Sequence, residues 1–191
     1  MDIELTVSYF NEYVAAQVVA IRAIKNLAVL DRGLTVDLFN VSSFDATIIH
    51  QLDIHTVESI AKKNSNLFSI RLPESETELM SALDAPDLSA IDYTSVDVRN
   101  AVISYKEAQL NAMIALKAFT NTSTATASLL TSTSLKDCET IASLPLNKII
   151  SLSQRYPWLF SLNYTYRNDI FTATAEVRRH IRTFVESTVI Y

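Results

Sequence analysis

Apolar residues recur at helical spacing over two long stretches of the chain, residues 8–30 and 95–119. Their apolar positions include Tyr13, Val14, Val18, Ile21, Ile24 and Ala28 in the first stretch, and Val102, Tyr105, Ala108, Ala112, Leu116 and Phe119 in the second. Side chains spaced three and four residues apart share one face of a helix. The pattern therefore predicts two long helices, each with one apolar face turned toward the other.

Shorter helices are predicted after each long one. A short helix is expected at Leu34–Phe39, and its counterpart at Thr126–Thr131 lies in a Ser/Thr-rich run whose composition favours helix less. Ser42 ahead of Asp45 is typical of an N-cap followed by an acid, and Pro145 suits the first turn of a later helix. Two short helices joined by a tight turn follow in each half, which predicts a helix-turn-helix-like pair in each.

Each helix pair is followed by a strand-like run. Residues 67–72, LFSIRL, and 159–166, LFSLNYTY, alternate roughly between apolar and polar side chains. Because an isolated short strand is not stable, we expect the two to pair with each other or to add to a partner's sheet. Residues 74–92 are predicted to form an acidic helix and a linker that breaks at Ala85-Pro86, and Thr172–Ser187 a closing helix.

The two halves are related in sequence by a shift of 92 residues. Without any gap, residues 13–72 and 105–164 share 15 identities in 60 positions. The identical pairs are Tyr13/Tyr105, Ala16/Ala108, Gln17/Gln109, Ala20/Ala112, Ala23/Ala115, Lys25/Lys117, Leu38/Leu130, Ser42/Ser134, Asp45/Asp137, Ile49/Ile141, Leu52/Leu144, Ser59/Ser151, Leu67/Leu159, Phe68/Phe160 and Ser69/Ser161. Chance does not readily keep one offset and one apolar phase over such a length. The sequence therefore indicates a tandem duplication, with the two copies packed about a pseudo-twofold axis like a fused dimer.

Composition favours helices and a reducing environment. The chain has one glycine, Gly33, where average usage is roughly 7%, and hairpin-rich folds need glycine in their turns. Its single cysteine, Cys138, excludes an internal disulfide framework and a multi-cysteine zinc site, and fits the cytoplasm. No basic region precedes an apolar stretch at the N-terminus, and no apolar run approaches the roughly 20 residues that cross a bilayer. A soluble, cytoplasmic protein is predicted.

Charge is distributed unequally between the halves. Residues 1–92 contain fourteen acids and six bases, a net charge of −8, whereas residues 93–191 contain seven acids and ten bases, a net charge of +3. Nucleic acid would be repelled by the first half and tolerated by the second. Drift in surface charge is an equally open explanation.

No constellation of residues predicts catalysis or a metal site. His50, His55 and His180 have no metal-ligand spacing with acids or cysteine, so we expect them to be satisfied or solvated. Cys138 lies between Asp137 and Glu139, whose charges raise the pKa of a thiol, and is expected to be a small core residue. One glycine cannot build a glycine-rich phosphate loop. The sequence predicts no enzyme, no cofactor and no small-molecule substrate.

The predicted helix at 145–156 carries the best candidates for nucleic-acid contact. Its polar face offers residue types that read base edges or hold phosphates, namely Asn147, Lys148, Ser151, Gln154 and Arg155. Arg178, Arg179 and Arg182 could add backbone contacts. The first copy presents Glu58 on the equivalent face, which would oppose phosphate. The alternative is a solvated helix face, with the arginines paired to Glu176 and Glu186.

The stretch LDIHTVESIAKKNSNLFSIRL, with ATIIHQL before it, resembles the FlhD family, a subunit of the flagellar master transcription activator. The matching residues are Leu52, Ile54, Ile60, Ala61, Asn64, Ile70, Arg71 and Leu72, and in the second copy Leu144, Leu146, Leu152 and Leu162. The second copy departs from the pattern with Tyr156 and Asn163 in place of the Asn and Arg. Family members often have a cysteine in the strand, where this chain has Phe68 and Phe160, so a cross-subunit disulfide is not expected.

The resemblance implies a mainly α fold of two tandem FlhD-like helical units that form a pseudo-twofold intramolecular dimer. Residues 1–86 would be the acidic first unit and residues 87–191 the mildly basic second unit. Each would contain a helix-turn-helix-like pair and one short strand. By analogy, the chain would assemble with a second, FlhC-like subunit to regulate transcription.

Two functions remain open at this stage. In the first, the chain is a subunit of a transcription regulator that binds DNA directly or through its partner. In the second, it is an adaptor or antagonist that presents the same surface to a regulatory complex without touching DNA. The acidic first half favours the second function, and the Lys- and Arg-bearing helix favours the first.

Overall fold

The computed structural model of the chain describes residues 3–39, 41–63, 67–84, 95–156 and 159–163. These residues are mainly helical, as predicted, with one two-stranded sheet. The elements in chain order are α1 (Ile3–Leu30), α2 (Arg32–Phe39), α3 (Ser43–Gln51), α4 (Ile54–Lys63), β1 (Phe68–Ile70), α5 (Glu76–Asp84), α6 (Val96–Thr131), α7 (Leu135–Ser143), α8 (Leu146–Arg155) and β2 (Phe160–Leu162).

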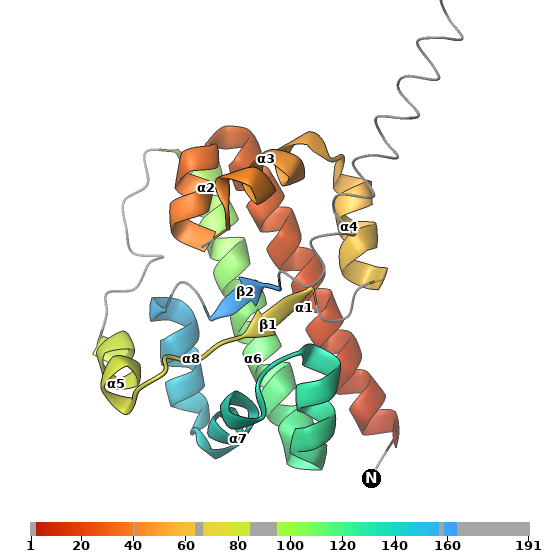
Figure 1. Cartoon of the computed structure of the whole chain (residues 1–191), viewed down its shortest axis with the longest axis vertical. Coiled ribbons are helices and arrows are strands. Elements are labelled where there is room, and N and C mark those ends of the chain that lie inside the picture. The colour runs from red at the N-terminus through yellow and green to blue at the C-terminus, as the bar shows by residue number, and fades with distance from the viewer. Residues whose placement is uncertain (1–2, 40, 64–66, 85–94, 157–158, 164–191) are drawn as a thin grey trace, which may run out of the picture.

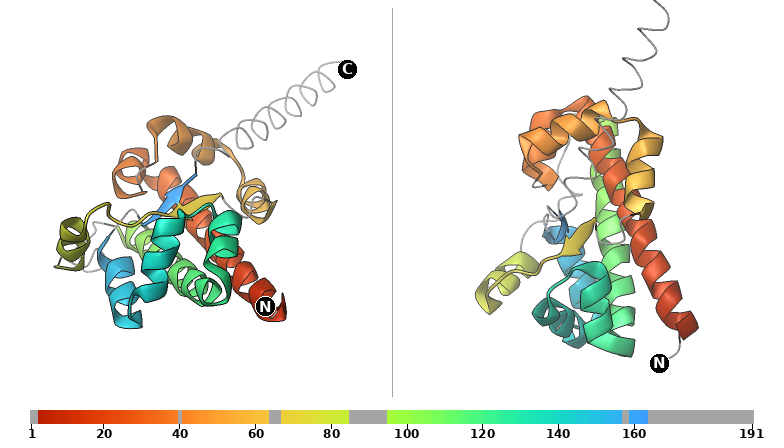
Figure 2. Two further views of the ribbon diagram at one scale, coloured as in Figure 1. Left: turned by 60° about the horizontal axis from the view of Figure 1, so that its bottom comes forward. Right: turned by 45° about the vertical axis from the view of Figure 1, so that its right-hand side comes forward.

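The long helices α1 and α6 lie side by side and form the centre of the molecule (Figure 1). Their shared face is buried, with Tyr13, Ala16, Ala20, Ile24 and Leu27 from α1 and Tyr105, Ala108, Ala112, Leu116 and Phe119 from α6. Small alanines at helical spacing allow two helix axes to approach closely. Two further views show the shorter helices and the sheet arranged around this pair (Figure 2). The expected contact between the two long helices is confirmed.

The stretch Glu4–Leu30 of α1 is also long and apolar enough to cross a membrane, judged by length and composition alone. The sequence pattern had predicted no apolar run of that length. Half of the most apolar part of that stretch is buried inside the protein. Core helices of this kind carry the same composition.

A kink divides helix α6 into a long segment and a short one, as the sequence pattern indicated. The helix continues to Thr131, with the kink at Ser123, whose φ of −165° and ψ of 106° are not helical. The Ser/Thr-rich run is stabilised by hydroxyls that donate to backbone carbonyls of the preceding turn, as Thr122 does to Phe119 (2.6 Å) and Thr131 to Ala127 (2.8 Å). Ser123 lies 92 residues after Asp31, which separates α1 from α2.

The helix-turn-helix-like pairs are present, and both begin with the same cap. The hydroxyl of Ser42 accepts a hydrogen bond from the Asp45 N–H, and that of Ser134 from the Asp137 N–H, each at 3.0 Å. The predicted N-cap at Ser42 is therefore confirmed. Pro145 is the N-cap of α8 and not a residue of its first turn. The fixed φ of proline suits both positions. A backbone N–H at either position would have no partner within the helix, so its absence costs nothing.

Strands β1 and β2 pair with each other in an antiparallel ladder, the first of the two predicted possibilities. Ser69 lies opposite Ser161, so each strand meets its counterpart 92 residues away in the chain. Beyond the strand ends the Arg71 N–H donates to the Leu159 carbonyl (2.8 Å) and the Asn163 N–H to the Leu67 carbonyl (2.7 Å). These two bonds are again related by a shift of 92 residues with the strands exchanged.

The outer edge of β1 is occupied by side chains. Tyr13 donates its hydroxyl to the Phe68 carbonyl (3.0 Å), and the Phe68 N–H donates to Gln17 Oε1 (2.8 Å). Further along the strand, the Ile70 N–H donates to the hydroxyl of Thr133 (3.1 Å). Burial raises the pKa of Tyr13 well above its ordinary value, so its hydroxyl stays protonated and remains a donor.

The edge of β2 is occupied in the same way. The Tyr105 hydroxyl donates to the Phe160 carbonyl, and the Phe160 N–H donates to Gln109 Oε1 (3.3 Å). Burial also raises the pKa of Tyr105. Each strand is therefore tied to the long helix of its own half. A further strand cannot add at these positions, because the backbone groups it would need are already bonded.

Aromatic rings fill the space under the sheet. Phe68 and Phe160 face each other across the two strands, with ring centroids 4.7 Å apart, and Tyr13 meets the edge of Phe160 at 5.8 Å. Both phenylalanines are fully buried. The two halves thus share one core, and neither strand covers its own apolar face alone.

We predict that Tyr13→Phe and Tyr105→Phe each lower the free energy of unfolding by about 1–3 kcal/mol, because each leaves a buried carbonyl without its donor. Urea unfolding followed by circular dichroism measures the loss. Tyr9→Phe is the matched control, since the half-buried Tyr9 hydroxyl has no hydrogen bond within the described part of the chain. If Tyr105→Phe were as stable as Tyr9→Phe, the hydrogen bond from Tyr105 to the Phe160 carbonyl would not stabilise the fold, which would contradict the prediction.

Candidate nucleic-acid interface

Helix α8 is positioned by its apolar side and by its C-terminal end. Ile149, Leu152 and Ser153 are buried against the core. At its end, the Lys106 ammonium donates to the carbonyls of Ser153 (3.3 Å) and Tyr156 (3.1 Å). Lys106 is itself buried, and cations near a helix C-terminus are stabilising. The sequence analysis did not single out this lysine, because the alignment pairs it with an apolar residue of the first half.

Gln109 supports the same helix end. Its Nε2 donates to the carbonyls of Ser153 (2.7 Å) and Tyr156 (2.9 Å), while its Oε1 accepts from the Phe160 N–H. One side chain therefore connects the long helix, the end of α8 and strand β2. The outer face of α8 is held rigidly with respect to the core.

Three of the five predicted contact residues on α8 lie on an open surface. Asn147, Lys148 and Gln154 are exposed, whereas Ser151 and Arg155 are half-buried. Donors and a cation on one helix face are the groups that bind phosphates and base edges. The other three candidates, Arg178, Arg179 and Arg182, lie outside the described residues.

Arg155 is occupied by another part of the chain. Its Nη1 donates to the Leu83 carbonyl at the end of α5, which packs beside α8 (Figure 1). The contact brings an acidic segment close to the candidate surface, since residues 74–84 contain four acids and no base. The pKa of Tyr156, at the end of α8, is raised first by burial and then by the charge of Glu78 on α5.

The counterpart face on α4 differs in its charges. Glu58, expected to oppose phosphate, accepts from Arg22 Nε (2.9 Å) and lies 4.0 Å from the Lys62 ammonium. Its charge is thus compensated locally. Lys62, Lys63 and His55 are exposed on the same helix. The two faces are therefore less different in charge than the sequence indicated.

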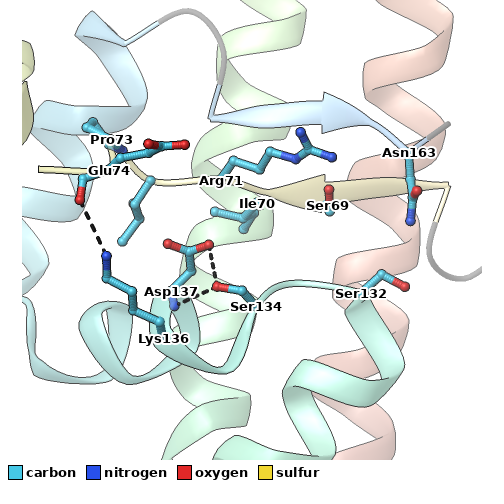
Figure 3. Close-up of a pocket in the computed structure, with 11 residues that line it drawn as sticks. Ser69, Ile70, Arg71, Pro73, Glu74, Ser132, Ser134, Lys136, Asp137 and Asn163 are labelled. Carbon is cyan, nitrogen blue, oxygen red and sulfur yellow. Dashed lines mark hydrogen bonds between the residues drawn. The ribbon is translucent and has the colours of Figure 1, made fainter.

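A polar hollow that the sequence analysis missed lies beside β1 (Figure 3). It has a volume of about 570 Å³ and is lined by Ser69, Ile70, Arg71, Leu72, Pro73, Glu74, Ser132, Ser134, Lys136, Asp137 and Asn163. Two bases and two acids line it, and Asp137 accepts from the Ser134 hydroxyl (2.7 Å) as part of the α7 cap. The formal charges cancel, so the hollow favours neither an anion nor a cation. It could not be read from the sequence, because it forms only when β1 meets the loop before α7.

The remaining titratable candidates have structural surroundings. Cys138 is fully buried in the core, as predicted. His50 Nδ1 lies 3.1 Å from the Ala28 carbonyl, and His55 is exposed. Within the described ranges no group of three His, Cys, Asp or Glu side chains could hold a metal ion. His180 lies outside those ranges.

Comparison with known proteins yielded no matching family model, no matching curated protein and no matching solved structure.

Cys138 provides a test of the core packing beside the interface. Burial, followed by the charges of Asp137 and Glu139, raises the pKa of its thiol from the usual 9.0 to about 12. Between these values the thiol ionises only in the unfolded chain, so the stabilising effect present below pH 9 is lost as pH rises. We predict that the free energy of unfolding falls less steeply with pH in Cys138→Ala, by up to about 1.4 kcal/mol per pH unit. Urea unfolding at several pH values above 9 measures it, and identical slopes for the two proteins would refute the prediction.

Proposed function

We propose that the chain is a fused pair of FlhD-like units that acts as a non-catalytic subunit of a transcription regulator. In this proposal residues 1–86 and 87–191 are the two units, related by a pseudo-twofold axis. The chain assembles in the cytoplasm with a second, FlhC-like subunit, and α8 faces DNA in the assembly. The proposal involves no membrane, cofactor or small-molecule substrate.

The register of the sheet is the observation that best supports the proposed duplication. In an antiparallel pair, a twofold axis can pass between two residues that lie directly opposite each other. Ser69 and Ser161 are such a pair and are 92 residues apart. An axis at this point exchanges β1 with β2, as it would exchange the subunits of a symmetric dimer.

Element boundaries support the same relation. Adding 92 to the limits of α3, α4 and β1 gives those of α7, α8 and β2, and the break at Asp31 corresponds to the kink at Ser123. Equivalent contacts also recur. Lys25 donates to the His50 carbonyl near the end of α3, and Lys117 donates to the Ala142 carbonyl (2.9 Å) near the end of α7.

The residues behind the FlhD resemblance occupy positions consistent with it. Leu52, Ile60, Ala61, Ile70 and Leu72 are buried in the core, whereas Asn64 lies outside the described residues. The two phenylalanine rings stack where family members often have cysteine. A buried aromatic contact would replace the cross-subunit link in a chain whose units are joined covalently.

The open face of α8 supports a role in DNA contact. Asn147, Lys148 and Gln154 are exposed on a helix whose opposite side and C-terminal end are fixed to the core. A rigid helix with a free polar face is the element that regulators place in a groove of DNA.

The adaptor function has its own support. Arg155 is engaged by α5, and the acids of residues 74–84 lie on the side of α8 where phosphates would approach. If these contacts persist in the assembly, the chain would bind its partner without touching DNA. The two functions differ in one measurable respect, the effect of α8 residues on DNA affinity.

We predict that Lys148→Ala weakens association of the chain, alone or with a FlhC-family subunit, with a labelled DNA duplex. Loss of one phosphate contact should reduce the salt dependence of log K by about 1. Fluorescence anisotropy over a salt series measures both quantities. Lys63→Ala is the charge-matched control on α4 and should leave them unchanged.

Each outcome separates the hypotheses. Co-elution with the FlhC-family subunit, together with a loss confined to Lys148→Ala, supports DNA contact through α8. Co-elution with no effect of Lys148→Ala on DNA supports the adaptor. Failure of the chain to bind either the subunit or DNA would reject the proposed regulator role.

A further inference from the structure

Helix α5 belongs to the first half of the sequence but packs on the second half. It follows β1, runs along the outside of the molecule and contacts α8 more than any other element (Figures 1 and 2). Its N-terminus is encoded locally by a capping box, in which Ser75 accepts from the Glu78 N–H (3.1 Å) and Glu78 accepts from the Ser75 N–H (3.3 Å). These local residues therefore determine where α5 begins. They do not determine where α5 packs on the rest of the protein.

The docking of α5 depends on few contacts. Ala82 and Leu83 are buried and Leu79 is half-buried, whereas Met80 on the other side is 51% exposed. A nine-residue helix is too short to be stable by itself in water. Elements with so few buried apolar contacts open at a small fraction of the free energy of global unfolding.

The polar part of the docking uses the one arginine of α8. Helix α5 has no basic residue in its last turn, and Arg155 supplies a positive charge there by donating to the Leu83 carbonyl. This bond uses one of the five N–H donors of the guanidinium and holds the half-buried Arg155 side chain against α5, away from an approaching phosphate. Glu78 of α5, whose charge acts on Tyr156 at the end of α8, also repels a polyanion that approaches this end of the helix.

We infer that residues 74–84 form an acidic strap that occupies Arg155 and competes with nucleic acid for α8. The inference rests on the DNA-contact part of the proposed function and adds a regulatory step to it. With the acidic strap docked, Lys148 is the exposed cation of α8, whereas Arg155 is half-buried and held against α5. When the strap is released, Arg155 becomes a second cation and the acids move away. Because the coupling is reciprocal, DNA that engages Arg155 also favours release.

The double variant Leu79→Ala/Leu83→Ala tests release without changing any charge. Hydrogen exchange of the α5 amides should become faster in this variant, and it should be unchanged in Met80→Ala, the control on the exposed side. If circular dichroism shows a loss of helix outside α5 in the double variant, Leu83→Ala alone is used for the same comparison.

DNA binding by these proteins then tests the competition. Measured by anisotropy with a mixed-sequence duplex, the double variant should bind several-fold more tightly than the parent, with a salt slope steeper by about 1. Adding Arg155→Ala should return the salt slope to that of the parent and remove most of this gain, leaving only the part due to the displaced acids. In the parent, Arg155→Ala should change the affinity much less, because the arginine is already occupied.

Two results would overturn the acidic strap. One is fast exchange of α5 with unchanged or weaker DNA affinity while Lys148→Ala still weakens binding, which leaves DNA contact by α8 intact. The other is a gain in affinity and salt slope that Arg155→Ala leaves undiminished. If no variant binds DNA with or without the FlhC-family subunit, both the strap and the DNA-contact function are wrong.

Discussion

Strands β1 and β2 are three residues long, and a strand of that length persists only when another element supplies its hydrogen bonds. Each receives its ladder from the other, and each outer edge is bonded to a tyrosine and a glutamine of its own long helix. The pairing therefore joins two chain segments 92 residues apart and at the same time fixes α1 and α6 over the buried rings of Phe68 and Phe160. The sheet, the central helix pair and the two helix-turn-helix-like pairs have to form together, since each covers the apolar face of another.

This shared core explains which features the sequence could predict. Helical spacing predicted the long helices because their buried faces repeat at 3.6 residues, and serine ahead of an acid predicted the cap of α3 because that bond is local. The instability of an isolated short strand predicted that the two strands pair with each other or with a partner's sheet, and the first alternative is observed. The short helix at Thr126–Thr131 was predicted as well, and Ser and Thr hydroxyls that bond to the preceding turn allow helix there although composition disfavours it.

The candidate site was predictable only in part. Amphipathic spacing identified α8 and its polar residues, of which Asn147, Lys148 and Gln154 are exposed. The contact between Arg155 and the Leu83 carbonyl joins residues 72 positions apart, and no local pattern encodes it. The polar hollow beside β1 likewise depends on tertiary placement. The charge count showed only that the first half is acidic. In the structure, some of these acids belong to α5, which packs against the more basic second half.

Equilibrium urea unfolding at widely different protein concentrations tests the central claim, that both halves of one chain share a single core, most directly. Pairing within the chain predicts one transition whose midpoint does not change with concentration. A midpoint that rises with concentration would show that the strands pair between chains. Two separate transitions would show that the halves fold independently, and either result would contradict the account.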